Sequence, residues 1–174
     1  MNTLQIFSAA VLSVVAFSAS AQAPNDAQIA AIVVTANQVD IDAGKLAAAR
    51  GTDPEVKKYG EQMVAAHTGV NKSATELVTK LKVKPEENAT SKALQAGGDK
   101  NLANLKSLKG AAFDKAYIDN EVAYHQQVLD AVDKTLIPSA SNAELKALLV
   151  KVRPAFVAHL EHAKQLQSSL SKSK

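Results

Sequence analysis

Five ionisable side chains occupy positions where helical periodicity would otherwise place apolar residues. The chain contains four His and no Cys, so any protein ligand set has to be built from imidazoles and carboxylates. Each of the five lies three or four residues from apolar neighbours on the same helical stripe. They are Asp40, His67, Glu121, His125 and His159. Buried ionisable groups need partners, because each one left uncompensated costs several kcal/mol.

Two kinds of chemistry fit this set. Two carboxylates and three imidazoles suit one transition-metal ion such as iron, manganese or zinc, which accept oxygen and nitrogen ligands. The same groups also suit a carboxylate–imidazole hydrogen-bond network that fixes the helix register, joined by the hydroxyl of Tyr117 or Tyr124. The sequence leaves both interpretations standing.

Other activities find no motif in the sequence. It contains no glycine-rich phosphate loop, no H-E-x-x-H and no G-x-S-x-G, so a binding or structural protein is favoured over an enzyme. Its 20 basic residues are spread among 17 acidic ones without an aromatic-interleaved patch, which argues against nucleic acid as a partner. The lysines of the C-terminal tail and of the crossover suit at most weak contacts with anionic lipid or envelope polymers, and the sequence does not identify a protein partner.

The elements that would position these residues are helices. Alanine is abundant, whereas Gly (7), Pro (5) and aromatic residues (4%) are scarce, which favours an all-α fold over a sheet. Four amphipathic helices are predicted, over about 26–50, 54–82, 111–136 and 141–170. Asp53 with Pro54 is typical of a helix start, and Ser141 with Glu144 matches a capping box.

The connections between these helices predict a topology. Short loops make the first two helices one antiparallel hairpin and the last two another, whereas about 28 polar, turn-rich residues (83–110) separate the pairs. One long crossover between two hairpins fits a ferritin-like four-helix bundle, and up-down-up-down order is the alternative. A short helix is expected at 100–108, inside the crossover. In either topology the five ionisable residues fall within about two helical turns of one another.

The N-terminal segment reads as a secretory signal peptide. Residues 1–21 contain no Asp, Glu, Lys or Arg, and the apolar run at 6–17 is shorter than the about 20 residues that span a bilayer. Small residues follow in A-x-A patterns, and cleavage after Ala21 is favoured. We therefore expect a periplasmic or secreted protein, with residues 22–174 as one domain and no transmembrane segment in the mature chain.

His162 is set apart from the other histidines. It follows Glu161 at the edge of its stripe, at about the height of Asp114. A surface or half-buried ion pair is therefore predicted for it, and it is left out of the core set.

Several of these segments together resemble a known family. They are M-V-A-A-H-T at 63–68, F-D-K-A-Y-I at 113–118, E-V-A-Y-H at 121–125, Pro154 with His159, and D-I-D-A-G-K-L-A at 40–47. In their order along the chain, these segments resemble the bacterial family of domain of unknown function 4142. The resemblance implies an exported ferritin-like four-helix bundle without an established reaction, and Asp40 stands where that family usually has Glu. The Glu-x-x-His pairs of di-iron ferritin-like proteins are absent, so oxygen chemistry is not predicted.

Overall fold

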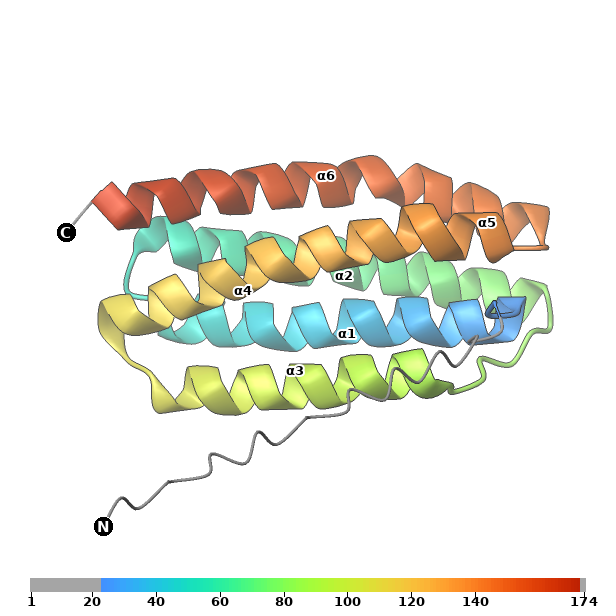
Figure 1. Cartoon of the computed structure of the whole chain (residues 1–174), viewed down its shortest axis with the longest axis horizontal. Coiled ribbons are helices and arrows are strands. Elements are labelled where there is room, and N and C mark those ends of the chain that lie inside the picture. The colour runs from blue at the N-terminus through green and yellow to red at the C-terminus, as the bar shows by residue number, and fades with distance from the viewer. Residues whose placement is uncertain (1–22, 173–174) are drawn as a thin grey trace, which may run out of the picture.

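The computed structural model describes residues 23–172, and every regular element in that part of the chain is helical. The prediction of an all-α fold is confirmed. The five long helices are α1 (Asp26–Arg50), α2 (Pro54–Lys80), α3 (Ala89–Ser107), α4 (Gly110–Ala131) and α6 (Ala143–Lys172), and a π-helical turn, η1 (Val132–Leu136), and the short α5 (Ile137–Ser139) connect α4 to α6 (Figure 1). The proposed signal peptide (1–21) and its cleavage site lie outside the described residues. Within the described part, no helix is long and apolar enough to cross a membrane.

Side-chain caps define most helix starts. Asn25 and Gln28 form a capping box at the start of α1. Asp53 caps α2 with Pro54 in the first turn, as the sequence predicted. These caps satisfy backbone N–H groups that have no partner within the helix.

The start of α6 corrects the predicted capping box. The side chain of Asn142, not Ser141, accepts hydrogen bonds from the backbone N–H groups of Glu144 and Leu145. Ser141 instead donates its backbone N–H to the carboxylate of Asp26 at the start of α1. A contact between two distant chain segments therefore moved the cap by one residue.

The crossover also differs from its prediction. Instead of a turn-rich segment with a short helix at 100–108, most of it is the 19-residue helix α3, capped by Asn88. Leu105 is fully buried, and Gly98 lies so close to α1 that a Cβ atom there would be 2.7 Å from the Val39 side chain. Packing against α1 thus stabilises a helix that local sequence only weakly favours.

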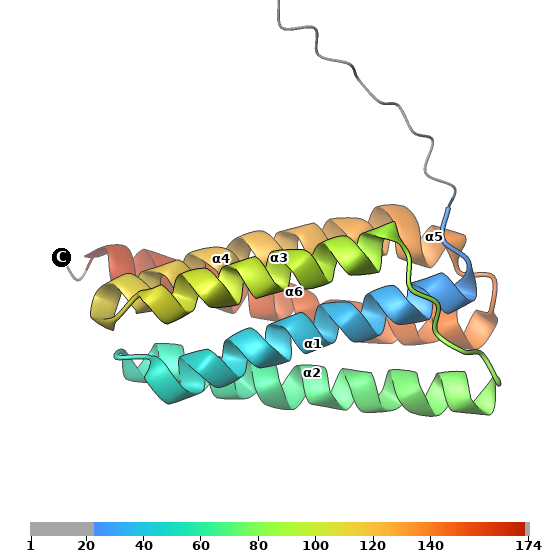
Figure 2. The ribbon, with the colours of Figure 1, turned by 90° about the horizontal axis from the view of Figure 1, so that it is seen from below.

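The long helices lie side by side. α1 pairs with α2, and α4 pairs with α6. α3 lies along α1 and runs in the same direction as α1 (Figures 1 and 2). Because α3 returns the chain to the end at which α2 began, α2 and α4 run in the same direction (Figure 1). The polar residues of α1 lie between two apolar core clusters, one that includes Ile29 and Ile32 and another that includes Ala43 and Ala47.

Two glycines bring α1 and α2 into close contact. A Cβ atom on Gly44 would lie 2.8 Å from the backbone oxygen of Gly60, and one on Gly60 would lie 2.7 Å from that of Gly44. Only glycine leaves room for this backbone approach. Gly44 is one helical turn after Asp40, so this contact also sets how near the Asp40 side chain comes to α2.

Candidate metal centre

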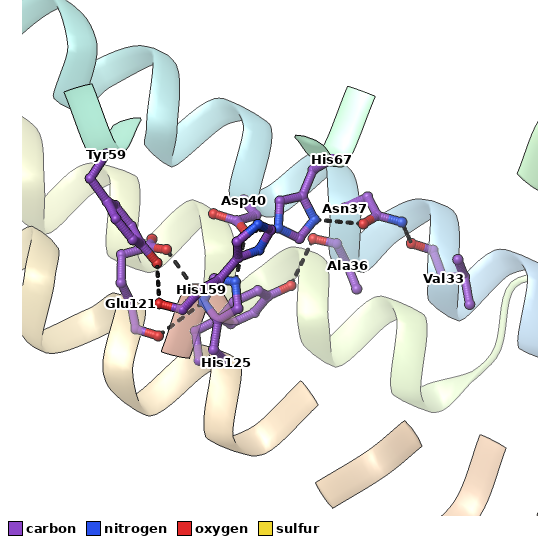
Figure 3. A network of polar contacts seen from close by, with 10 residues as sticks. Val33, Ala36, Asn37, Asp40, Tyr59, His67, Glu121, His125 and His159 are labelled. Carbon is purple, nitrogen blue, oxygen red and sulfur yellow. Dashed lines mark hydrogen bonds and ion pairs between the residues drawn. The ribbon is translucent and has the colours of Figure 1, made fainter. Parts of the chain in front are cut away.

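The five residues singled out by their spacing meet in the core between the helices (Figure 3). Asp40 comes from α1, His67 from α2, Glu121 and His125 from α4, and His159 from α6. The first four are at most 3% exposed, and His159 is partly buried. We call these five residues the core cluster.

Three imidazole rings form a triangle within the core cluster. The ring centroids of His67, His125 and His159 lie 5.3 to 5.6 Å apart. One nitrogen from each ring lies within 4.8 Å of the other two. Phe156 stacks on the His67 ring at a centroid distance of 5.4 Å, which restricts the rotation of that ring.

A second group joins the two carboxylates to the same rings. One ligand atom each of Asp40, Glu121 and His125 lies within 4.8 Å of the others, so His125 belongs to both groups. Asp40 Oδ2 is 2.7 Å from His67 Nε2 and 3.5 Å from His125 Nε2. One carboxylate oxygen thus faces two imidazole nitrogens.

Asn37 fixes the tautomer of His67. Its amide nitrogen donates to the backbone oxygen of Val33 at 2.8 Å, so the amide oxygen is the atom that lies 2.6 Å from His67 Nδ1. Since that oxygen can only accept, Nδ1–H is the donor, and a neutral His67 carries its lone pair on Nε2. That lone pair is on the side of the ring that faces Asp40.

His125 is held in the same way by its own helix. Its Nδ1 lies 3.1 Å from the backbone oxygen of Glu121, one turn earlier, and a carbonyl oxygen can only accept. Nδ1–H therefore donates, and Nε2 of neutral His125 faces the core cluster with a lone pair. Imidazoles that bind metals usually have their second nitrogen fixed by such a hydrogen bond to a carbonyl or carboxylate.

The atoms that face one another in the core cluster have no hydrogen-bond partner among the described residues. They are both Oδ atoms of Asp40, Oε2 of Glu121, Nε2 of His67, Nε2 of His125 and Nδ1 of His159. The 2.7 Å contact between His67 and Asp40 is short, but it lacks the geometry of a hydrogen bond. Buried polar atoms are normally paired, so these six atoms need either shared protons or a bound cation to satisfy them.

Burial and mutual charge shift the pKa values of the carboxylates in opposite directions. Burial acts to raise the pKa of Asp40, but His67 and His125 outweigh it, so that pKa is lowered. Burial, reinforced by the charge of Asp40, raises the pKa of Glu121 well above its usual range. Of the two neighbouring carboxyl groups, Asp40 therefore holds the negative charge.

Two of the imidazoles lose affinity for a proton. Burial lowers the pKa of His125. Burial, followed by the nearby His67 and His125, lowers the pKa of His159 to about 4. At neutral pH both rings are neutral, which is the form that binds metal ions.

The tyrosines around the cluster are mostly engaged with the backbone. The hydroxyl of Tyr124 donates to the backbone oxygen of Ala36 at 2.7 Å, so it does not supply the hydrogen bond that the network interpretation assigned to it. The hydroxyl of Tyr59 donates to the backbone oxygen of His159 at 3.2 Å, tying α2 to α6. Burial raises the pKa of Tyr117, whose hydroxyl has no hydrogen-bond partner in the described chain.

The ion pair predicted for His162 is not found in the described part of the chain. Asp114 is buried and accepts hydrogen bonds from the backbone N–H groups of Thr52 and Asp53. His162 instead packs edge-on against the Tyr59 ring, at a centroid distance of 5.2 Å. The demand of the α1–α2 loop for acceptors explains why Asp114 is committed elsewhere.

Asn37 is the residue of this site that the sequence did not single out. It is 2% exposed, three residues before Asp40 on the same face of α1. The sequence does hold a signal for it, because Asn37 is a polar residue one turn from Asp40, which was predicted to be buried.

Comparison with known proteins identifies a family. A family model described as domain of unknown function (DUF4142) matches residues 13–166. Neither a curated protein nor a solved structure matches the chain.

Proposed function

The chain belongs to the DUF4142 family, and we propose that it is an exported protein that binds one transition-metal ion at the core cluster, for storage, buffering or stability. The observation that carries the proposal is the set of six buried ligand atoms without hydrogen-bond partners on Asp40, Glu121 and the three histidines. The family description assigns no activity, so the proposal rests on the site.

The donor atoms suit such an ion. Ligand bonds of about 2.0–2.2 Å place neighbouring ligand atoms about 2.8–3.6 Å apart in octahedral or tetrahedral geometry. Of the distances from Asp40 Oδ2 to the two imidazole nitrogens, the 3.5 Å to His125 lies within that range and the 2.7 Å to His67 lies just below it. Three imidazoles with two carboxylates favour iron, manganese or zinc. A divalent cation would also let Glu121 ionise beside Asp40.

The fold and location belong to the same proposal. The parallel direction of α2 and α4 (Figure 1) supports a ferritin-like four-helix bundle of α1, α2, α4 and α6, with α3 as a helix within the crossover. The uncharged, apolar segment 1–21 supports export to the periplasm or the exterior, with cleavage after Ala21.

Metal content tests the proposal directly. The chain, with its N-terminal segment 1–21, is produced in a bacterial host that can export it. The exported protein is then purified without chelators, and its metal content is measured by elemental analysis. About one equivalent of iron, manganese or zinc per chain is expected, and His159→Ala is expected to lose it. His162→Ala is the matched control, because His162 lies one turn further along α6 and packs on Tyr59 outside the core cluster.

One outcome would overturn the proposal. Less than about a tenth of an equivalent of metal, no uptake on reconstitution and no effect of chelators on stability would leave the hydrogen-bond network as the role of the cluster. The protein would then be a non-catalytic structural or interaction protein of the cell envelope.

A further inference from the structure

A cavity of about 830 Å³ lies beside the core cluster. Its walls come from α1, α2, α3, α4, η1 and α6, and they include His67 and His125. Pockets for small organic ligands commonly have volumes of about 300–1,000 Å³, so this one has room for such a molecule.

The cavity wall carries no full charge. Among the described residues that line it there is no Asp, Glu, Lys or Arg, although 21% of the chain is charged. Most of the lining is apolar, and the polar groups in it are amides, hydroxyls and the two imidazoles. The cavity is partly open to solvent, and the part of an ionic ligand that lay against this wall would lose hydration without meeting an opposite charge, which is unfavourable.

Several hydrogen-bonding groups of the wall are already engaged. The hydroxyl of Tyr124 already donates to Ala36, and Nδ1 of each imidazole is held by Asn37 or by Glu121. Asn101 donates to Asn120 at 2.9 Å, which links α3 to α4 at the cavity. That amide pair keeps the Asn101 oxygen and the Asn120 NH₂ group for one hydroxyl or carbonyl group of a ligand.

One end of the wall is an irregular helix. Val132, Thr135 and Leu136 line the cavity and belong to the π-helical turn η1. Single π-helical turns are rare, and they occur frequently at functional sites. The irregularity lies where α4 borders the cavity.

We propose that this cavity binds a neutral, mainly apolar small molecule with a hydroxyl or carbonyl group. The size of the cavity, its uncharged wall and the Asn101–Asn120 pair each point to that chemistry. The inference goes beyond metal binding, because the cavity and its lining do not depend on an ion.

Three ligands with the same chain but different head groups test the charge preference. The full-length gene product, purified after export, is loaded with the neutral fluorescent probe N-phenyl-1-naphthylamine, and 1-decanol, decanoate and decylammonium are compared as competitors. We expect 1-decanol to displace the probe at a concentration at least about tenfold lower than either ion, a difference of about 1.4 kcal/mol. Equal displacement by an ion, or no binding of the probe and 1-decanol, overturns the proposal.

Matched glycine variants locate the binding. A Cβ atom at Gly97, in the cavity wall on α3, meets nothing within 4 Å, and the same holds for Gly69 on α2, which does not line the cavity. Gly97→Leu is expected to weaken probe binding at least about tenfold, whereas Gly69→Leu leaves it unchanged. Both changes favour the helix, so loss of fold does not confuse the comparison.

A second cavity variant and a metal assay separate the cavity proposal from the metal proposal. Ala93→Leu, one turn earlier in the same wall, should act like Gly97→Leu, and unchanged binding in both variants overturns the proposal. Metal content is measured on the same samples. Metal without probe binding contradicts only the cavity proposal, and probe binding without metal contradicts only the metal proposal.

Discussion

The amide oxygen of Asn37 lies 2.6 Å from Nδ1 of His67, and this contact decides which ring nitrogen faces the core cluster. The bond from Asn37 to the Val33 oxygen prevents the amide from turning over. A neutral His67 would therefore present the lone pair of Nε2 to Asp40, and two groups that can only accept would then lie 2.7 Å apart. A proton or a metal ion satisfies this demand, and the predictions below separate the two.

Replacing Asn37 should weaken metal binding without removing a ligand. In Asn37→Leu the acceptor for Nδ1–H is lost, and loss of such supporting bonds usually costs about 10–100-fold in metal affinity. Competition with a chromophoric chelator measures the change. Asn71→Leu is the control, since the one hydrogen bond of the Asn71 side chain in the described part of the chain goes to the Val34 oxygen, at 3.4 Å, and this variant should keep the parental metal affinity. Equal losses in both variants would mean that Asn37 acts through packing alone.

Metal binding should release a proton from Glu121. Burial and the charge of Asp40 raise the pKa of this carboxyl, so in the metal-free protein it keeps its proton to a higher pH than an ordinary Glu, and it must ionise to become a ligand. Calorimetry in buffers with different ionisation enthalpies counts the protons released. Glu121→Gln should release about one fewer proton per metal ion than the parent. An unchanged count would show that Glu121 is not a ligand.

The sequence predicted which ionisable residues meet in the core better than it predicted their surroundings. Asp40, His67 and Glu121 stood out because an ionisable residue on an apolar stripe is costly unless it is paired. Asn37 did not stand out, because an uncharged amide fits an exposed helix face as well as a buried one. Its position therefore gave no signal of the kind that a buried ionisable group gives. The orientation of the histidine rings depends on hydrogen bonds of the folded chain and cannot be read from spacing.

Dependence on contacts of the folded chain also explains where the predicted helices and caps were wrong. Periodicity sufficed for the four amphipathic helices, but α3 has Gly97 and Gly98 in its interior, a local signal for a turn. The packing of Gly98 on Val39 is a tertiary contact that overrides this signal. The Asn142 cap was likewise decided by a distant residue, because Asp26 holds the backbone N–H groups of Ser141 and Asn142.

Acid should destabilise the metal-free protein partly through His159. The pKa of His159 is lowered to about 4 in the folded protein, against about 6.5 in the unfolded chain. Between these values the unfolded chain binds more protons, so the free energy of unfolding falls as the pH is lowered from 6.5 to 4. Urea unfolding across this window should show a smaller fall for His159→Gln than for the parent. Identical pH profiles would rule out this contribution.

Removing two ligands together should abolish metal binding and keep the fold. Glu121→Leu with His125→Leu takes a carboxyl and an imidazole out of the core, and replacing buried ionisable groups by apolar residues of similar size is often neutral or stabilising. Circular dichroism should show parental helix content, and elemental analysis should show no metal. A variant that still takes up one equivalent would contradict the ligand assignment, and one that fails to fold would contradict the apolar replacement argument.

The close contact between α1 and α2 should control metal affinity as well as stability. In Gly44→Ala the new Cβ would lie 2.8 Å from the backbone oxygen of Gly60, so the two helices must separate. Such overpacking typically costs about 1–3 kcal/mol of unfolding free energy. Because Asp40 is one turn from Gly44, the separation also moves its carboxylate away from His67, and metal affinity should fall with stability. Gly69→Ala is the control, since a Cβ there meets nothing within 4 Å, and it should gain about 0.5–1 kcal/mol from helix propensity. If Gly44→Ala lost stability but bound metal with parental affinity, the spacing of α1 and α2 would not set the position of Asp40.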